Sequence, residues 1–449
     1  MKRWRMILLA AVLCLLTACG GQSAQESVSS VPETPASSVQ TELPAEPEQP
    51  AEPEQPAEPE VPGEPGLTQT EQAILAERRE TAENYMRAMA TVIWRAEEDI
   101  AYTVESGKTP EESAESSRLY IKAGRLYRGM PYSYGYSTLE TFLSFTEKPE
   151  GSLVYTVSGL EWQALSRGSG GSNLGNDCSG ALVAAWSQIG ATTPMNSTKT
   201  MCEKYGFLKV GEYESDPNEN ADTHIVTMEK NGEQVMYRAY AQLQKADGIV
   251  RRKGSSGHAR MIVSVSVAYN ADGTIDGEKS TVTFLDQTRS YLRSEKKHYN
   301  SVLGEYVYEI YGVDKRVTFK TLCQDGYLPI TCKELIDPSP VAEPEVTDSV
   351  TEHDRSTILS GKISSNWVID TVTVIITDST GNEVQKATLN AHRTSPWSFD
   401  MQKFLKEAPE VMQGSIDLQA LTPGVYHCTT VCRLGIGREF TVREFDFTV

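Results

Sequence analysis

The chain has 449 residues, of which 39% are hydrophobic, and a formal net charge of −19 at pH 7. This acidic balance disfavours nucleic acid as a partner, because binding phosphates needs a basic surface. The sequence has no GxGxxG motif, no GxxxxGK[ST] motif and no zinc-type CxxC pair, which disfavours a nucleotide-binding or structural-metal protein. We therefore expect no cofactor and no metal.

The N-terminus combines a basic start with a short apolar run, "MKRWRMILLAAVLCLLTAC". The run is too short to span a bilayer and is typical of a signal-peptide core. It ends in "LTAC", which resembles the lipobox of bacterial lipoproteins. That resemblance implies a signal peptide over residues 1–18 and lipid modification of Cys19. The protein is then anchored to the bacterial cell membrane outside the cytoplasm, facing the cell wall; an ordinary secretory signal is the alternative.

Residues 19–67 read as the lipid anchor and a tether rich in Pro and Glu. They repeat "PAEPEQ" and hold almost no large apolar residue, so they cannot bury enough surface to fold. An extended polyproline chain rises about 3.1 Å per residue, so the tether could reach roughly 100 Å. This reach suits an anchored protein that works some distance away in a cell wall.

The pattern after the tether is that of a folded domain. Residues 68–100 have apolar residues at helical spacing without Gly or Pro, which predicts one long amphipathic helix or two. Residues 117–336 mix helical and strand patterns, and "RMIVSVSVAYN" and "STVTFLDQT" read as strands on either side of the turn "ADGTIDG". We predict one α+β domain over residues 68–338, with an N-terminal helical extension.

A second change of composition, "DPSPVAEPEVTDS", predicts a linker over residues 339–356. Short alternating strands with turn signals then predict a small all-β sandwich over residues 357–449. This part resembles the immunoglobulin-like modules of bacterial surface proteins, which implies a role in spacing or docking.

Four cysteines in the later part of the chain bear on disulfides. Cys323 and Cys332 could close a small loop in an oxidising compartment. Cys428 and Cys432 are four residues apart in a predicted strand, which is too far to bond unless the chain bends.

The stretch "GNDCSGALVAAW" turns abruptly apolar after Cys178. Apolar residues then recur at helical spacing until Gly190, which predicts a buried helix with Asn176 or Asp177 as its N-cap. The helix dipole stabilises negative charge at the N-terminus and lowers the pKa of a thiol there. Papain-like cysteine peptidases share this geometry. An inert buried cysteine fits it too, so a reactive thiolate needs a base.

Six histidines are candidates for that base. His258 follows a glycine turn and begins an apolar strand, so it can face a helix N-terminus while the strand packs in the core. His224 has a weaker version of this pattern, and His298 lies in a charged loop. The other three lie in or near the second domain. Position alone favours His258.

Three motifs, in order, resemble those of the NlpC-type cell-wall peptidases, a papain-like family. "YRGMPYSYG" resembles the family's G-x-PY-x-x-G segment, "GNDCSGALVAAW" its DCSG helix start, and "GSSGHARMIV" its GHVGIY strand. The resemblance covers residues 129 to about 288. It implies a papain-like catalytic domain in which N-terminal helices pack on an antiparallel sheet.

The resemblance also implies roles for the catalytic residues. Cys178 would attack the scissile carbonyl with its proton held by His258, and the Cys178 N–H would help hold the oxyanion. The family's third residue is polar and lies on the next strand. Direct matching gives Asp286 and a slip of one gives Gln287, and only one of them can face His258 because side chains alternate along a strand. We favour Asp286, since a carboxylate also stabilises the imidazolium.

Three further residues match family positions for substrate binding. Tyr132 matches the tyrosine beside the nucleophile, and Asp177 and Ser179 match residues that bind the free amine of a stem peptide. Each has a structural alternative: Tyr132 as core, Asp177 as a helix cap and Ser179 as a first-turn residue.

Two departures from the family pattern leave the substrate open. Long inserts occupy residues 136–176 and 198–246, and the family's "GD" before the histidine strand becomes "ADGIV". Such inserts shape a substrate groove or act as a lid.

Together these features predict an extracytoplasmic, lipid-anchored cysteine hydrolase that cleaves an amide in peptidoglycan stem peptides, next to γ-D-glutamate. One alternative is an amidase or acyl-transfer enzyme on the same scaffold. Another is a non-catalytic surface binding lipoprotein, which the joint presence of a thiol, a base and a polar third residue disfavours. The expected partners are peptidoglycan, or another envelope amide, and the membrane through Cys19. The sequence does not specify an oligomeric state.

Overall fold

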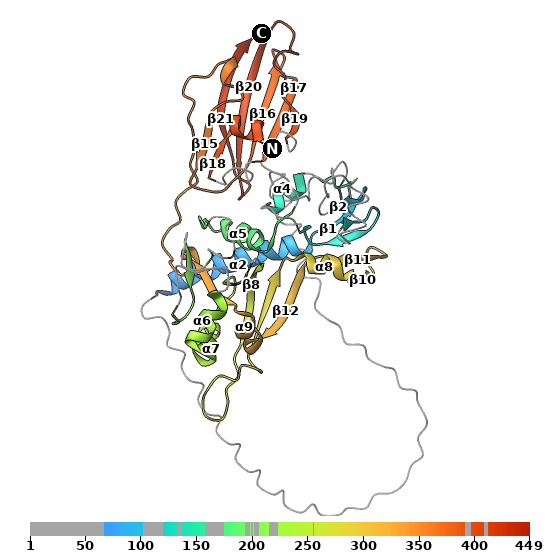
Figure 1. Cartoon of the computed structure of the whole chain (residues 1–449). Coiled ribbons are helices and arrows are strands. Elements are labelled where there is room, and N and C mark those ends of the chain that lie inside the picture. The colour runs from blue at the N-terminus through green and yellow to red at the C-terminus, as the bar shows by residue number, and fades with distance from the viewer. Residues whose placement is uncertain are drawn as a thin grey trace, which may run out of the picture. The chain divides into compact units, whose positions relative to one another are not determined.

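The computed structural model describes residues 67–101, 120–132, 137–144, 146–157, 175–193, 198, 201, 206–214, 223–254, 256–390, 397–407 and 412–449. The predicted signal peptide, Cys19, nearly all of the tether and residues 158–174 of the insert 136–176 lie outside these residues. Thr68–Val449 form one unit, which is described below (Figure 1). Within the described residues, no helix has the length and apolar character needed to cross a membrane.

Helix α2 (Gln69–Thr91) opens the second unit, and its start follows from local hydrogen bonding. The Thr68 backbone N–H donates to the Glu71 carboxylate at 2.7 Å, and the Thr68 hydroxyl accepts from the Glu71 N–H at 3.3 Å. This reciprocal capping box satisfies two donors that a helix N-terminus leaves free. The helix ends earlier than expected, because Val92 and Ile93 are β-branched and the chain continues as strand β1 (Ile93–Ala96). The prediction of helix up to residue 100 is therefore wrong beyond Thr91.

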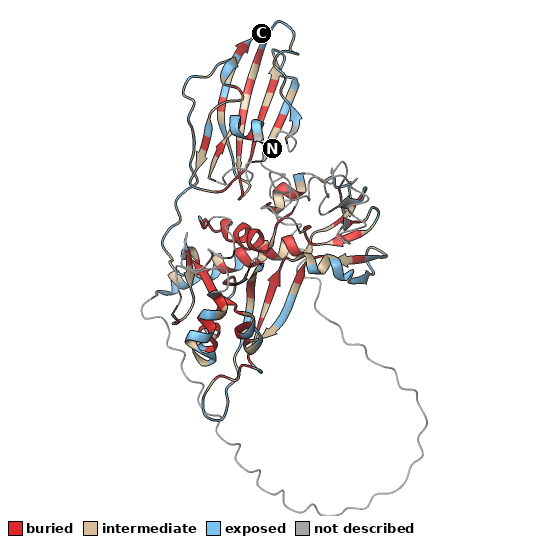
Figure 2. Ribbon diagram, in the orientation of Figure 1, coloured by how far each residue is buried: buried red, intermediate tan, exposed pale blue. Residues whose placement is uncertain are grey.

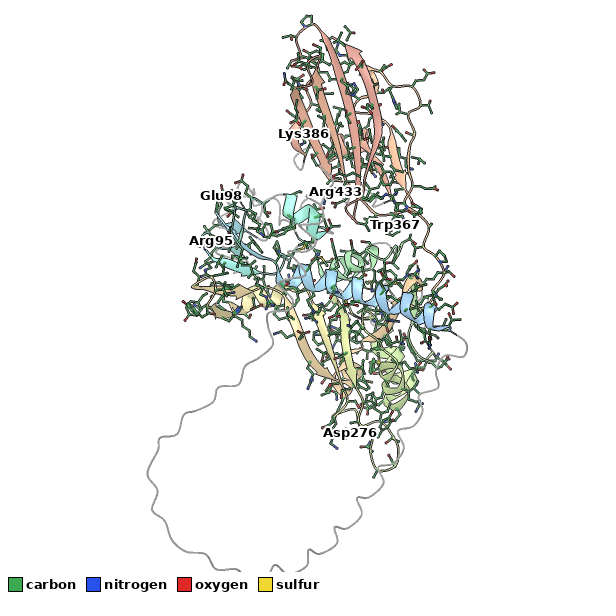
Figure 3. All side chains as sticks on the ribbon, turned by 180° about the vertical axis from the view of Figure 1, so that it is seen from behind. Arg95, Glu98, Asp276, Trp367, Lys386 and Arg433 are labelled. Atoms are coloured by element: carbon green, nitrogen blue, oxygen red, sulfur yellow. The ribbon has the colours of Figure 1, made fainter. Side chains whose placement is uncertain are left out.

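The larger sheet of the α/β part carries most of the residues predicted to be functional. It has the order β12-β9-β8-β7-β13-β6, and every neighbouring pair is antiparallel. The predicted strands correspond to β8 and β9, and Figure 3 shows Asp276 in the turn between them. The strand bounds are β6 Phe207–Lys209, β7 Gly248–Lys253, β8 Ser256–Ser266, β9 Thr281–Asp286, β12 Gly312–Thr318 and β13 Leu328–Cys332.

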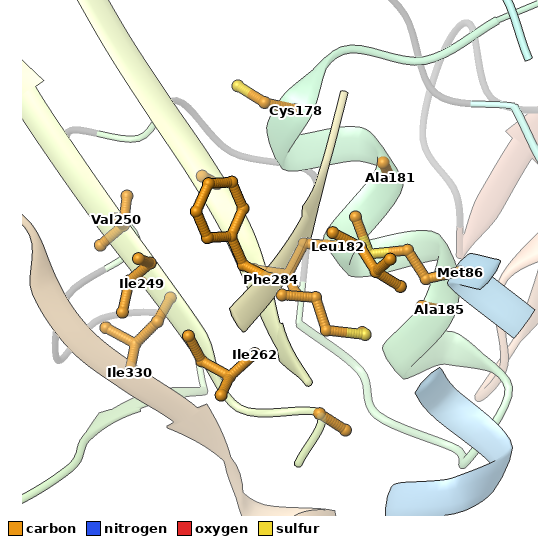
Figure 4. Packing of buried hydrophobic residues seen from close by; sticks show 14 of the residues in the cluster. Met86, Cys178, Ala181, Leu182, Ala185, Ile249, Val250, Ile262, Phe284 and Ile330 are labelled. Carbon is orange, nitrogen blue, oxygen red and sulfur yellow. The ribbon is translucent and has the colours of Figure 1, made fainter. Parts of the chain in front are cut away.

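Helix α5 (Cys178–Ser187) packs against both α2 and β8, and every one of its residues is buried. Its apolar side chains interlock with Met86 of α2 and with Ile249, Val250, Ile262, Phe284 and Ile330 of the sheet (Figure 4). Gly248 leaves room for Leu182, since a Cβ at Gly248 would lie 2.9 Å from Leu182 Cδ2. The Trp186 indole N–H donates to the Ala246 carbonyl at 2.8 Å, so the one polar atom of that buried ring is satisfied. Burial is thus continuous from the helix into the sheet (Figure 2).

A smaller mixed sheet and several helices complete the α/β part. The sheet has the order β10-β11-β4-β1-β5, with β5 and β1 parallel and β11 and β4 parallel. The remaining elements are β2 Ile100–Ala101, β3 Tyr120–Ile121, β4 Leu126–Arg128, β5 Tyr155–Val157, β10 Lys297–Asn300, β11 Glu305–Glu309, α4 Leu139–Ser144, α6 Thr223–Asn231, α7 Glu233–Ala241, α8 Arg289–Ser294, α9 Phe319–Asp325 and η2 Lys333–Leu335.

The C-terminal part consists of two antiparallel sheets around a separate hydrophobic core. Alternating residues of β16 and β20 point into this core, as the period of a half-buried strand requires. Strand β14 lies within the residues predicted as a linker and pairs with β15. One sheet consists of β14 Val346–Asp348, β15 Lys362–Ser365 and β18 Ser398–Asp400. The other consists of β16 Ile369–Asp378, β17 Glu383–Asn390, β19 Gln413–Ser415, β20 Val425–Leu434 and β21 Glu439–Thr448. In chain order, η3 Arg355–Thr357 precedes β15 and α10 Met401–Glu407 follows β18.

Candidate active site

Cys178 is the first residue of α5, and Asp177 is the N-cap. The Asp177 carboxylate accepts a hydrogen bond from the Gly180 N–H at 2.6 Å and another from the Ser179 hydroxyl at 2.8 Å. Of the two caps considered, Asp177 is therefore confirmed. The two residues expected to bind a substrate amine are instead bonded to each other in this structure, and burial raises the pKa of Asp177.

The Cys178 thiol is largely buried at the N-terminal end of α5, while Ala181, Leu182 and Ala185 of the same helix lie in the core (Figure 4). Burial and, to a smaller extent, the negative charge of Asp177 together raise the pKa of Cys178 to about 12. A hydrogen bond with the Ala259 backbone favours the thiolate but does not offset these effects. The expectation that the helix dipole lowers this pKa is therefore wrong for the resting structure, because burial and the neighbouring carboxylate outweigh it.

His258 lies on β8 next to the Ala259 peptide that contacts the thiol. Its Nε2 lies 2.9 Å from Oδ2 of Asp286, at the end of β9. Asp286 is an acceptor, so Nε2 carries the proton and Nδ1 keeps the basic lone pair. Burial lowers the pKa of His258, although the hydrogen bond to Asp286 acts in the opposite direction. Among the described residues there is no hydrogen bond between the thiol and this ring, so thiol and base are neighbours that are not yet bonded.

Asp286 and Gln287 point in different directions, as alternation along a strand requires. Asp286 contacts His258, whereas Gln287 is fully buried and its side-chain amide donates to the Met130 carbonyl at 2.6 Å. Burial by itself would raise the pKa of Asp286. The hydrogen bond with His258, the charges of His258 and Arg260 and the hydrogen bond with Tyr291 together lower it below its usual value.

Tyr132 lies beside the start of α5. Its backbone forms a parallel bridge with Asn176, two residues before Cys178. Gly175 permits this close approach, because a Cβ there would overlap the Pro131 carbonyl. The local pairing of two segments that are far apart in sequence therefore places Tyr132 near the candidate nucleophile.

Four residues around the site were not predicted from sequence. Arg260 and Tyr291 both donate to Asp286, and Gly312 packs against that carboxylate. The Tyr327 ring meets the His258 ring edge-on, with the ring centroids 6.4 Å apart. Of these four residues, only Arg260 could have been placed near the site from sequence, because it lies two positions after His258 and therefore on the same face of the strand.

The other histidines are placed differently. His224 lies in helix α6, not in a strand, and burial lowers its pKa to about 4. His298 lies 2.8 Å from Glu309, and His427 lies 2.7 Å from Asp446 at the surface of the C-terminal part. His353 is in the C-terminal part, and His392 lies outside the described residues.

The cysteines other than Cys178 form no disulfide within the described residues. Cys323 and Cys332 are both buried and free, so they do not close the small loop that their spacing allows: one thiol lies in α9 and the other at the end of β13. Cys428 and Cys432 are also free, as their spacing predicts. The described residues contain no cluster of three or more His, Cys, Asp or Glu that could hold a metal ion.

Comparison with known proteins adds little. No protein-family model matches the chain, and no curated protein matches it. Among solved structures, it is weakly similar to a crystal structure of a tetra-tandem repeat in the extending region of a large adhesion protein, at 16% identity and a TM-score of 0.16. The match covers 45% of this chain and 40% of that one, and a score this low carries no argument about fold or function.

Proposed function

We propose that the chain is a cell-envelope cysteine hydrolase with Cys178 as nucleophile, His258 as base and Asp286 as the residue that orients the base. The observation that carries this proposal is the buried His258–Asp286 hydrogen bond of 2.9 Å, next to a thiol that contacts the peptide following His258. A helix N-terminus and two strand ends supply the three groups. A packed core needs no such convergence of polar side chains.

The resting site is a neutral thiol and a neutral imidazole. Burial raises the pKa of Cys178 and lowers that of His258, so neither group is charged at neutral pH. His258 Nδ1 takes the thiol proton as Sγ bonds to the scissile carbonyl carbon, and the imidazolium then gives that proton to the leaving amine. Water, activated by the same nitrogen, hydrolyses the thioester and regenerates the thiol.

Asp286 and the helix N-terminus stabilise the charges that develop in these steps. Asp286 keeps the proton on Nε2 and stabilises the imidazolium once it forms. The Cys178 backbone N–H, at the start of α5, is available to the oxyanion of the tetrahedral intermediate. Tyr132, held beside this point by its bridge to Asn176, can add a hydroxyl donor.

The proposed substrate is an amide in peptidoglycan stem peptides. Asp177 and Ser179 are the groups proposed to receive the free amine of the peptide, and their mutual hydrogen bond would have to open to do so. A lipid at Cys19 and the tether over residues 19–67 would hold the enzyme within reach of the wall. The two-sheet C-terminal part is proposed as a docking or spacing module.

The test is digestion of purified peptidoglycan by the full chain and by Cys178→Ala, with the released fragments identified by mass spectrometry. New stem-peptide fragments that require Cys178 support the proposal and reveal the bond cleaved. Identical profiles for the two proteins, together with cleavage of a different amide or ester by the wild type alone, favour the amidase or acyl-transfer alternative. Binding of peptidoglycan without any Cys178-dependent product favours the binding lipoprotein.

A further inference from the structure

The carboxylate of Asp286 is held by three donors from different places in the fold. His258 Nε2 and Arg260 Nε share one oxygen, Oδ2, at 2.9 and 3.3 Å. The Tyr291 hydroxyl of α8 donates to the other oxygen, Oδ1, at 2.6 Å. Gly312 closes the fourth side, because any Cβ there would overlap both Oδ1 and the Tyr291 hydroxyl. The carboxylate therefore has one fixed orientation.

Arg260 is itself fixed in place by aromatic rings. Its guanidinium lies 4.2 Å from the centroid of the Phe284 ring and 4.6 Å from that of the Tyr327 ring. The side chain is 17% exposed, and an arginine keeps its charge at all ordinary pH values. A permanent, rigid cation thus shares a carboxylate oxygen with the candidate base.

We propose that Arg260 is a positioning residue that acts through Asp286: it shares Oδ2 with His258, which fixes the orientation of the imidazole and weakens the pull of the carboxylate on a second ring proton. A buried carboxylate next to a histidine favours imidazolium, so Arg260 acts in the same direction as burial. An imidazolium has no lone pair with which to accept the thiol proton. The consequence for catalysis rests on the proposed function, whereas the effect on the histidine does not.

The other charged or titratable groups that act on His258 do not replace Arg260. Arg251 on β7 is the cross-strand neighbour of His258; it pairs with Asp325 at 3.4 Å and makes no bond to Asp286 among the described residues. Asp177 and Cys178 face the site from α5, and both have a raised pKa. The Tyr327 hydroxyl also has a raised pKa and stays neutral. Arg260 is the cation bonded to the carboxylate that His258 uses.

The pKa of His258 is consistent with this geometry. Burial lowers it most, Asp286 opposes that effect, and Arg260 and Arg251 lower it further. Replacing Arg260 with a neutral residue removes the positive charge that counters Asp286 at the shared oxygen. The pKa of His258 should then rise, and the sign of this change is the signature of the proposal.

The experiment is an NMR titration of the full chain with isotope-labelled histidine, in which His258→Gln assigns the resonance. Arg260→Gln should raise the pKa of His258 by about one unit, as removal of a nearby like charge does. Arg260→Lys keeps the charge and should restore most of the wild-type value. Arg251→Gln, the matched control, removes a cation that pairs with Asp325 and does not contact Asp286, so it should shift the pKa of His258 much less. If Arg260→Gln does not fold, Arg260→Met keeps the packing between the two rings and is titrated instead.

An unchanged or lower pKa of His258 in the neutral variants, or an equal shift in Arg251→Gln, would overturn the proposal. In parallel, the pH profile of peptidoglycan hydrolysis is measured for the same proteins. On the acid side of the profile, the pH at which half of the activity is lost should rise in Arg260→Gln by the same amount as the pKa of His258. If the wild type hydrolyses nothing, the proposed function fails, and the titration still decides the role of Arg260.

Discussion

Among the described residues, two histidine–aspartate pairs join neighbouring strands, and the two pairs differ in what surrounds them. His258 and Asp286 lie 2.9 Å apart, with side chains only 12% and 2% exposed. His427 and Asp446 lie 2.7 Å apart on β20 and β21, with side chains 35% and 74% exposed. The second distance is the shorter one, so proximity does not distinguish them. An exposed pair contributes little to the stability of the fold, because water screens its charges.

The position of the nearest thiol also differs between the two pairs. Cys428 follows His427 directly in sequence but faces the hydrophobic core, because adjacent residues of a strand point to opposite faces. Cys178 and His258 are far apart in sequence and come near each other because α5 packs on β8. A thiol and an imidazole on adjacent residues of one strand point to opposite faces, whereas two different elements can bring them together.

The largest expected effect distinguishes the two thiols. Cys178→Ala should abolish the proposed hydrolysis of peptidoglycan, because no other group of the site can form the acyl intermediate. Cys428→Ala should leave the rate unchanged. Quantifying released stem peptides by mass spectrometry checks both, with circular dichroism to confirm that each variant is folded. Substantial activity in Cys178→Ala would remove this residue from the mechanism.

The two carboxylates should differ almost as strongly. Asp286→Asn keeps the shape of the side chain but loses the charge that stabilises the imidazolium, so we expect a loss in kcat of about 10³-fold. Asp446→Asn changes only an exposed pair and should have no effect. Comparing kcat/KM for both variants against the wild type is the measurement; equal losses would contradict the distinction between the two pairs.

The stability of the protein in acid offers a third test, which concerns the buried His224. Burial lowers the pKa of His224 to about 4 in the folded protein, from 6.5. Between these values the unfolded chain binds a proton that the folded chain does not, so stability falls as pH falls from 6.5 to 4. This contribution is about 3 kcal/mol.

Urea unfolding at pH 7 and near pH 4, followed by tryptophan fluorescence, measures this loss. His224→Gln should reduce this pH dependence of the free energy of unfolding. The lowered pKa of His258 acts with the same sign, so some dependence should persist in His224→Gln. An unchanged slope in that variant would show that His224 is not buried as described.

The smallest expected effect concerns the backbone behind Asp286. In Gly312→Ala the new Cβ would overlap Oδ1 of Asp286 and the Tyr291 hydroxyl, so the carboxylate must turn. We expect about a tenfold loss of kcat with the fold retained, because small misplacements of catalytic groups are costly. Gly424→Ala is the matched control, since the nearest atom to its Cβ is 3.7 Å away. Equal kinetics in the two variants would mean that the carboxylate tolerates displacement.

Much of the site could be predicted from local patterns. The helix from Cys178, its Asp177 cap and the strands that carry His258 and Asp286 all follow from periodicity and capping chemistry. The sequence could not separate Asp286 from Gln287, because a slip of one residue exchanges the two faces of a strand. The thiol pKa was predicted with the wrong sign, since burial depends on packing that no local pattern reveals.

The rest of the fold was harder to predict for identifiable reasons. The strands of the smaller sheet are only three to five residues long, such as Leu126–Arg128, which is too short for a clear alternation. Strand β14 in the expected linker exists because it pairs with β15 and because the buried Arg443 donates to Asp348 at 2.9 Å. Arg260 and Tyr291 could not be assigned to Asp286 without knowing how β8, β9 and α8 come together.

The most direct test of the account is to trap the covalent intermediate. The full chain is mixed with a synthetic stem peptide, quenched in acid within the first turnover and digested for mass spectrometry. The account predicts that the fragment carrying Cys178 gains the mass of the acyl part of the substrate, and that His258→Ala abolishes this gain. Cleavage of the peptide without any adduct at Cys178, persisting in Cys178→Ala, would contradict it.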